Sequence, residues 1–204
     1  MNKEVKSEGM LVVLSAPSGC GKDTVLAELD GRVENLRRSV SMTTRKMRDD
    51  ETDGADYFFV GESDFESKIN GGEMLEYTRY NGHYYGTLKK PVDELLKKGE
   101  TVVLKIEVEG AGKIRSMYPD AVTIFLVPPS MQTLEKRLRK RMSEGERDIR
   151  NRMAIAVCEI KHADSYDYIV VNDQIDYAVS DICSIIRAER LKTKRSLNSI
   201  CLYE

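Results

Sequence analysis

The sequence is poor in the side chains that build metal centres and disulfide frameworks. Four cysteines and two histidines are present in 204 residues, and no two cysteines form a CxxC pair. A zinc site or a disulfide-stabilised fold is therefore not expected, and the cysteine usage indicates a reducing, cytoplasmic compartment. No apolar stretch approaches the length of a membrane-spanning helix. We therefore expect no association with a membrane.

Neither sign of charge dominates the chain. The formal net charge is −2, which argues against a nucleic-acid partner held by bulk electrostatics. The positive charge is nevertheless concentrated in the segment 136–152. Its basic residues are Lys136, Arg137, Arg139, Lys140, Arg141, Arg147, Arg150 and Arg152. Nothing in the composition indicates an oligomeric state.

Short apolar runs alternate with helical patterns along most of the chain. Runs rich in Val and Ile occupy 10–14, 101–106, 122–127 and 168–171. Helical patterns occupy 24–29, 89–98, 131–142, 148–162 and 177–191. Strands that alternate with helices predict an α/β fold, with a parallel sheet covered by helices on both faces. The first apolar run is too short for a signal peptide, so we interpret it as a buried strand.

The segment 39–87 breaks this alternation. It contains SVSMTTR, DYFFV, EMLEYTRY and HYYGT, which are short strand-like pieces, and a helical pattern at 63–70. Turn signals occur at 70–72 and at Asn81-Gly82. These features predict an inserted, mainly antiparallel lobe. Within it, we interpret Tyr84 as an aromatic residue that packs against its strand neighbours.

A glycine-rich turn follows the first predicted strand and precedes a helical pattern. It comprises Ala16, Pro17, Ser18, Gly19, Cys20, Gly21, Lys22, Asp23 and Thr24. In this setting, backbone N–H groups enclose phosphate oxygens, and the new helix adds its positive N-terminal end. Lys22 can reach the β- and γ-phosphates of a nucleotide. The turn therefore predicts a P-loop that binds ATP.

Two positions depart from the usual G-x-x-x-x-G-K-[ST] pattern. Ala16 replaces the first glycine, which is a mild change if its φ is negative. Asp23 stands where Ser or Thr normally helps to hold Mg²⁺. Asp23 and Thr24 are therefore the metal-side candidates, acting largely through water. Cys20 lies at a helix N-terminus, which favours a thiolate, but we interpret it as a small side chain tolerated by the turn.

Further motifs follow in the predicted lobe and beyond it. The segment 41–59 reads SMTTRKMRDDETDGADYFF, and EMLEY, HYYGT and LKIEVEG come later. Together with the P-loop, these motifs resemble the guanylate kinases, whose pattern runs S-x-T-T-R-x-x-R-x-x-E-x-x-G-x-D-Y. The resemblance extends over about residues 9–190 in the order and spacing of that family, which makes it highly specific.

The chemistry of these residues supports the same interpretation. Arg45 and Arg48 carry planar guanidinium groups that suit a phosphate monoester, and Tyr57 and Tyr85 could donate hydroxyl hydrogen bonds to it. Guanine presents two adjacent donors that one carboxylate can accept together, and Glu76 is the candidate. Adenine lacks that pair of donors. Considered alone, the two arginines would be interpreted as surface partners of nearby carboxylates.

The resemblance implies roles for further residues. Around the guanine base it places Ser41, Thr87 and Glu107 beside Glu76, and it implies that Glu51 supports the arginines. It assigns the catalytic positions to Lys22, Arg45, Arg137, Arg141 and Arg152, the last three acting as a lid closes. Asn172 resembles the contact on the adenine side. One residue departs from the pattern, because Lys105 stands where the family usually has an acidic residue, near Mg²⁺ and the acceptor phosphate.

The resemblance also implies an organisation and a reaction. We expect a single domain, with a core at about 9–38, 89–137 and 154–192, a GMP-binding lobe at about 39–88 and a lid at about 138–153. The tail 193–204 is expected to be loosely held. The implied reaction is ATP + GMP → ADP + GDP with Mg²⁺ as cofactor and dGMP as a second acceptor.

Two alternatives to this function were weighed. One is a guanylate-kinase-like module that binds peptides and has lost catalysis; the persistence of Lys22, Arg45, Arg137 and Arg141 weighs against it. The other is a P-loop kinase for a different phosphate ester, which the complete set of guanine-side residues disfavours.

Overall fold

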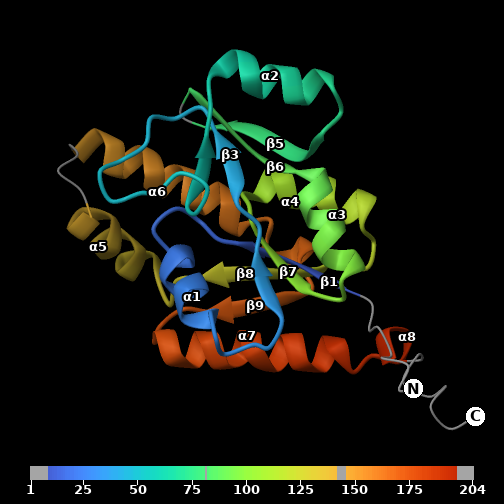
Figure 1. Cartoon of the computed structure of the whole chain (residues 1–204). Helices are drawn as coiled ribbons and strands as arrows, with labels where there is room; N and C mark the ends of the chain where they lie inside the picture. Colours follow the sequence, from blue (N-terminus) through green and yellow to red (C-terminus); the bar gives the residue numbers. More distant parts are fainter. Residues whose placement is uncertain (1–8, 81, 142–145, 197–204) are drawn as a thin grey trace, which may run out of the picture.

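A five-stranded parallel sheet forms the centre of the molecule (Figure 1). The computed structural model describes residues 9–80, 82–141 and 146–196, except for the side chain of Arg141. The strands of this sheet are β1 (Met10–Ser15), β2 (Leu36–Arg38), β7 (Thr101–Lys105), β8 (Val122–Val127) and β9 (Tyr168–Val171). Their order across the sheet is β2-β7-β1-β8-β9. The predicted parallel α/β fold is confirmed.

Helices cover both faces of this sheet. They are α1 (Lys22–Leu29), α3 (Lys89–Lys97), α4 (Val108–Met117), α5 (Met131–Arg141), α6 (Glu146–Ile160), α7 (Ile175–Arg190) and the short α8 (Thr193–Ser196). Buried side chains of α1, α5 and α7 pack in one hydrophobic cluster. Those of α3 and α4 pack in the cluster on the opposite face. Within the described ranges, no helix is long and apolar enough to cross a membrane.

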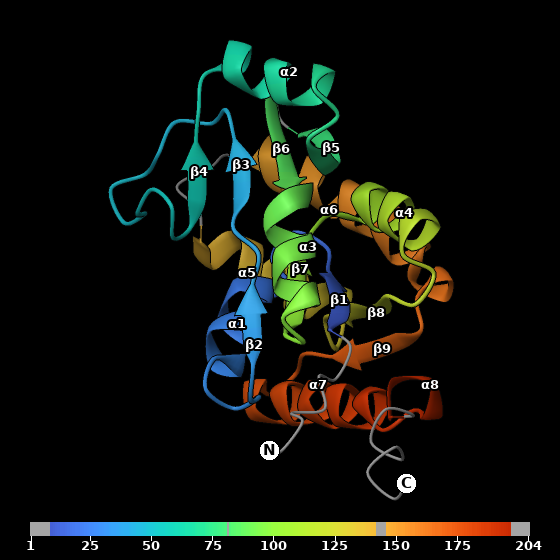
Figure 2. The same cartoon turned by 45° about the vertical axis from the view of Figure 1, so that its right-hand side comes forward.

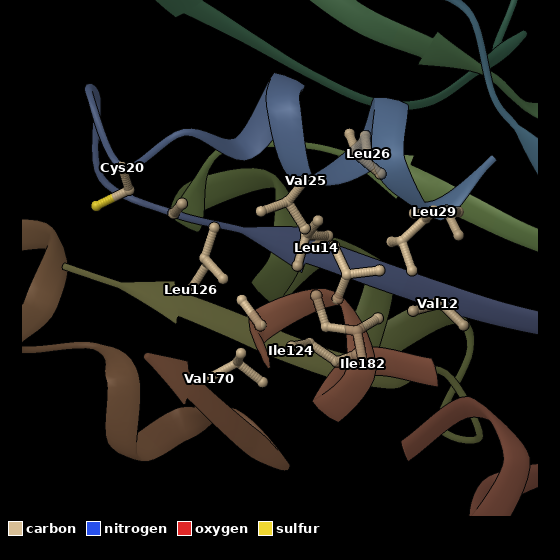
Figure 3. Close-up of a cluster of buried hydrophobic side chains, with 14 of the residues drawn as sticks. Val12, Leu14, Cys20, Val25, Leu26, Leu29, Ile124, Leu126, Val170 and Ile182 are labelled. Atoms are coloured by element: carbon tan, nitrogen blue, oxygen red, sulfur yellow. The ribbon is translucent and has the colours of Figure 1, made fainter. Parts of the chain in front are cut away.

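The central strand β1 is buried along its whole length because apolar side chains leave it on both faces. Val12 and Leu14 belong to the cluster with α1 and α7 (Figure 3), whereas Leu11 and Val13 belong to the cluster with α3 and α4. Successive side chains of a strand point to opposite faces, so an uninterrupted apolar run suits a strand covered on both sides. The P-loop is thereby anchored to the most buried strand of the sheet.

A second sheet lies beside the first and is mainly antiparallel, as predicted. It contains β3 (Ser41–Thr43), β4 (Tyr57–Phe59), β5 (Met74–Tyr80) and β6 (His83–Leu88) in the order β4-β3-β6-β5. Only the β3–β4 pair is parallel. The helix α2 (Glu62–Asn70) lies at the end of this sheet that is remote from α7, at the top of Figures 1 and 2. Its Phe65 stacks on Tyr84 at 5.1 Å between ring centroids, so Tyr84 is a packing residue, but its partner lies on a helix and not on a neighbouring strand.

Some elements differ from the predictions. The strand β2 and the helix α4 were not predicted. The strand β2 is a short edge strand with two exposed arginines, and α4 carries two glycines that obscure its helical pattern. The tail expected to be loosely held begins with α8, where Arg195 donates to the Glu189 carboxylate at 2.9 Å. Residues 197–204, the break at 143–145 and Asn81 of the predicted turn lie outside the described residues.

Candidate active site

The turn between β1 and α1 has the backbone form of a phosphate cradle. Gly19 and Gly21 have φ values of +89° and +85°, a region that side chains with a Cβ rarely adopt. The Cys20 N–H donates to the Pro17 carbonyl at 3.1 Å, which closes the turn. Residues 16–23 line a pocket of about 140 Å³ together with Tyr80, Glu107 and Glu159. Consecutive backbone N–H groups in such a turn make a site for anions.

Lys22 lines this pocket and is held by acceptors that directly follow the neighbouring strand β7. Its Nζ lies 3.0 Å from Oε1 of Glu107 and 3.4 Å from the carbonyl oxygen of Ile106. Both acceptors follow β7, which pairs in parallel with β1. The carboxylate of Glu107 therefore positions the lysine that the sequence assigns to the ATP phosphates.

Cys20 and Asn172 stabilise the P-loop through buried contacts. The Cys20 side chain is fully buried, and burial raises the pKa of its thiol to about 12. The thiolate expected from its place at a helix N-terminus is therefore disfavoured, and the packing interpretation is confirmed. Nδ2 of Asn172 donates to the Cys20 carbonyl at 2.7 Å. The role of Asn172 on the adenine side stays a prediction.

Two of the three departures from the family pattern, Asp23 and Lys105, lie next to each other. Nζ of Lys105, at the end of β7, lies 2.9 Å from Oδ1 of Asp23, in the first turn of α1. They are 82 positions apart in the sequence. The charges of Lys105 and Asp23 therefore compensate each other. The two sequence motifs, read separately, gave no indication of this pairing.

The pocket between the two sheets contains most of the residues assigned to the acceptor. It measures about 170 Å³. Its lining comprises Ser41, Tyr57, Glu76, Thr78, Tyr80, Tyr85, Gly86, Lys105, Ile106 and Glu107. Tyr80 and Glu107 also line the P-loop pocket. The two pockets therefore adjoin, with shared walls.

Glu76 is a buried carboxylate on the strand β5. It is only 5% exposed, and Oγ1 of Thr87 donates to its Oε1 at 2.8 Å. Burial raises the pKa of Glu76 to about 7, against the smaller lowering effect of the Thr87 hydrogen bond. A buried ionisable group in a pocket is characteristic of a functional site.

Gly110 is a site residue that the sequence reasoning missed. A Cβ at this position would lie 2.6 Å from Oε2 of Glu76. Gly110 belongs to α4, which begins directly after Glu107. The glycine therefore lets α4 approach the carboxylate closely, and no signal in the sequence indicated this because the helix itself was not predicted.

Arg45 is held in place by Glu51 through two hydrogen bonds. Nη1 and Nη2 of Arg45 donate to Oε2 and Oε1 of Glu51 at 2.9 and 2.6 Å. The side chains are only 15% and 12% exposed, and Arg45 lowers the pKa of Glu51. The guanidinium carbon of Arg45 lies 5.6 Å from the ring centroid of Tyr57, and the Arg48 N–H donates to Glu51 at 2.8 Å. Glu51 thus supports the guanidinium of Arg45, as the resemblance implied, but contacts Arg48 only through the backbone.

The structure describes the three arginines assigned to a predicted lid to different extents. Nη2 of Arg137 donates to the Asn172 carbonyl at 2.9 Å, and Nη1 is buried without a hydrogen-bond partner among the described residues. Arg152 lies on α6 near Tyr80. Arg139 pairs with Glu135 and Glu146 at the exposed surface, in agreement with its interpretation as part of a solvated face. The predicted catalytic side chain of Arg141 lies outside the described residues.

A further pocket of about 430 Å³ shares Gly19 and Gly21 with the P-loop pocket. Its lining includes Gly19, Gly21, Thr24, Arg137 and Asn172. A phosphate cradle that shares residues with two further pockets suits a P-loop kinase, in which a donor and an acceptor must meet in line across the transferred phosphoryl group.

Comparisons with known proteins identify the family. The family model for guanylate kinase matches residues 8–189. The guanylate kinase of Lactobacillus acidophilus is 48% identical over 94% of this chain and 94% of its own. That of Carboxydothermus hydrogenoformans is 46% identical over 92% of each chain. The crystal structure of guanylate kinase from Anaplasma phagocytophilum has a TM-score of 0.78 and 37% identity, covering 93% of this chain and 90% of that chain. The chain belongs to the guanylate kinase family, the ATP:GMP phosphotransferases.

A first prediction concerns the contact between α4 and Glu76. We expect Gly110→Ala to displace the Glu76 carboxylate and to weaken GMP binding by about tenfold, the cost of a misaligned charged hydrogen bond. Gly112→Ala is the matched control, because Gly112 lies in the same helix and a Cβ there would have no neighbour within 4 Å outside that helix. Isothermal titration calorimetry with GMP measures both. Equal affinities of the two variants would show that Gly110 does not position Glu76.

A second prediction concerns pH. The pKa of Glu76 is raised to about 7, so its carboxyl is increasingly protonated below that pH. If the ionised form accepts the guanine donors, GMP affinity falls by about tenfold from pH 8 to pH 6. The GMP phosphate itself titrates near pH 6, and Glu76→Gln isolates that contribution. An equally steep pH dependence in the Gln variant would contradict the role of Glu76.

Proposed function

We propose that ATP binds with its phosphates in the P-loop and that GMP binds in the pocket between the two sheets. The observation that carries this assignment is the shared wall of the two pockets, formed by Tyr80 and Glu107. Substrates bound there would face each other across that wall, which is the positioning that phosphoryl transfer requires.

The base of GMP is recognised by Glu76. Its two carboxylate oxygens accept hydrogen bonds from N1–H and the exocyclic amine of guanine. Thr87 already donates to Oε1, and Ser41 and Glu107 line the same pocket. Burial supports this role because an ionised carboxylate in a dry pocket requires donors, and adenine offers none at the matching positions. A site built to hydrogen-bond one substrate discriminates strongly against another that leaves its groups unpaired.

The phosphate of GMP is held by Arg45, Arg48, Tyr57 and Tyr85. The Glu51 carboxylate fixes the guanidinium of Arg45, so less side-chain freedom is lost when the phosphate binds. Tyr57 and Tyr85 lie 6.0 Å apart between ring centroids and line the same pocket. These contacts concern only base and phosphate, so dGMP is proposed as a second acceptor.

On the ATP side, Lys22 exchanges Glu107 for the β- and γ-phosphates. Arg137 stabilises the transition state. Its Nη2 donates to the Asn172 carbonyl, which fixes the side chain, and its buried Nη1 has no hydrogen-bond partner in the described part of the chain. A buried N–H without an acceptor is costly, and a phosphate oxygen would satisfy it. Arg141 and Arg152 join as the lid 138–153 closes and excludes water. Positioned cations stabilise the transferred group without a covalent intermediate.

The residues at the start of α1 fit a magnesium ion that arrives with ATP. Among the described residues, no group of three or more His, Cys, Asp and Glu side chains could hold a metal by itself. Magnesium characteristically takes one or two protein oxygens together with water and substrate phosphates. The Asp23 carboxylate and the Thr24 hydroxyl are oxygen donors of this kind. The ion would neutralise charge on the β- and γ-phosphates.

A third prediction tests the acceptor assignment. Coupled measurement of ADP formation with GMP, dGMP, AMP, UMP and CMP is expected to give turnover with the two guanine nucleotides. Glu76→Gln is expected to raise the KM for GMP by about 30-fold or more, because one guanine donor then faces an amide N–H₂. The ATP affinity should stay unchanged.

Glu73→Gln is the matched control for this variant, since Glu73 precedes the same strand and is exposed. Absence of turnover with every acceptor, despite ATP binding, would favour the peptide-binding alternative. Turnover with a non-guanine acceptor would favour a kinase for another phosphate ester.

A further inference from the structure

The ion pair between Lys105 and Asp23 lies at the junction of the proposed ATP and GMP sites. Lys105 ends β7 and Asp23 lies in the first turn of α1, with 2.9 Å between Nζ and Oδ1. Asp23 lines the P-loop pocket, whereas Lys105 lines the pocket between the sheets. The pair therefore connects a side chain on the donor side with one on the acceptor side.

Lys105 is directed toward the residues proposed to bind the acceptor phosphate. Its Nζ lies 4.7 Å from the ring centroid of Tyr57, and the guanidinium carbon of Arg45 lies 5.6 Å from the same centroid. Two cations thus converge on one aromatic ring. The Lys105 side chain is only 25% exposed.

Asp23 and the phosphate of GMP differ in how strongly they attract Lys105. The Asp23 side chain is 67% exposed, so water screens its attraction for the lysine. A nucleotide phosphate carries about −1.5 to −2 charges near neutral pH and accepts strong, charge-assisted hydrogen bonds. In the less exposed pocket around Tyr57, that phosphate is the stronger partner. The flexible stem of a lysine allows the head group to change partner.

We propose that Lys105 exchanges Asp23 for the acceptor phosphate when GMP binds, and that this exchange makes the Asp23 carboxylate available on the metal side of ATP. The inference rests on the proposed placement of GMP. In this proposal Lys105 contacts the substrate directly. Asp23 positions Lys105 before GMP binds and competes with the GMP phosphate for it. The binding of GMP and of magnesium nucleotide is thereby coupled, each favouring the other.

Calorimetric titration of GMP without ATP or magnesium tests the exchange. Lys105→Met is expected to weaken GMP binding by about tenfold or more, through loss of a charge-assisted hydrogen bond. Asp23→Asn is expected to strengthen it by about two- to fivefold, since the competing anion is removed. In the double variant, the Asp23 change should have no further effect on GMP binding, because the proposed competition with the phosphate requires Lys105. Guanosine, which has no phosphate, should bind each folded variant with an affinity within about twofold of wild type.

A second measurement addresses the metal without relying on turnover. With ADP in place of ATP, the apparent magnesium affinity of the wild-type protein is expected to increase when GMP is added, and to stay constant in Lys105→Met. Circular dichroism melting verifies that each variant is folded, and Lys105→Gln replaces Lys105→Met if that variant is not.

The outcomes separate this inference from the proposed function. If Asp23→Asn weakens GMP binding, or strengthens it equally with and without Lys105, the pair is a fixed structural contact and the exchange is wrong. If magnesium affinity is indifferent to GMP in the wild-type protein, the coupling is wrong. If the wild-type protein does not bind GMP at all, the proposed function itself fails.

Discussion

The parallel pairing of β1 with its neighbours is the constraint on which the site depends. β1 is buried on both faces, and its register with β7 sets Leu14 opposite Lys105. Because the carboxyl ends of parallel strands share one edge, the residues after β7 reach the P-loop. Lys22 can therefore contact Glu107, and Asn172, which follows β9, can contact Cys20. Each of these contacts joins segments that are far apart in the sequence.

Three ion pairs give the site its electrostatic character. Lys22 pairs with Glu107, Arg45 with Glu51 and Lys105 with Asp23. In each case the cation is the group proposed to bind a phosphate, and the carboxylate holds it in place. A carboxylate carries less charge than a nucleotide phosphate, so it can orient a cation and still be replaced. The Arg45 pair is the exception, because its doubly hydrogen-bonded geometry is suited to remain while the phosphate binds another edge of the guanidinium.

The sequence predicted the features that depend on local pattern. Apolar runs such as 10–14 and 122–127 became the buried strands, and the glycines at positions 19 and 21 became the positive-φ turn. Features that depend on contacts between distant segments were not predictable in the same way. The helix α4 was obscured by glycine, although Gly110 is needed there because Glu76 lies against it. Asp23 and Lys105 each appeared as an isolated departure, and only the fold brings them together.

Glu76 illustrates how burial turns a carboxylate into a discriminating group. At an exposed position, water hydrates a carboxylate that has no other partner. A base that cannot donate to the carboxylate would then lose little binding free energy. In a position that is 5% exposed, water is largely excluded and ionisation is disfavoured, as its raised pKa records. A base with two donors relieves that cost, whereas a base with an acceptor at the same place adds to it. The proposed selectivity of the pocket therefore follows from the free energy of desolvating Glu76, which the close packing of Gly110 maintains and the hydrogen bond from Thr87 partly offsets.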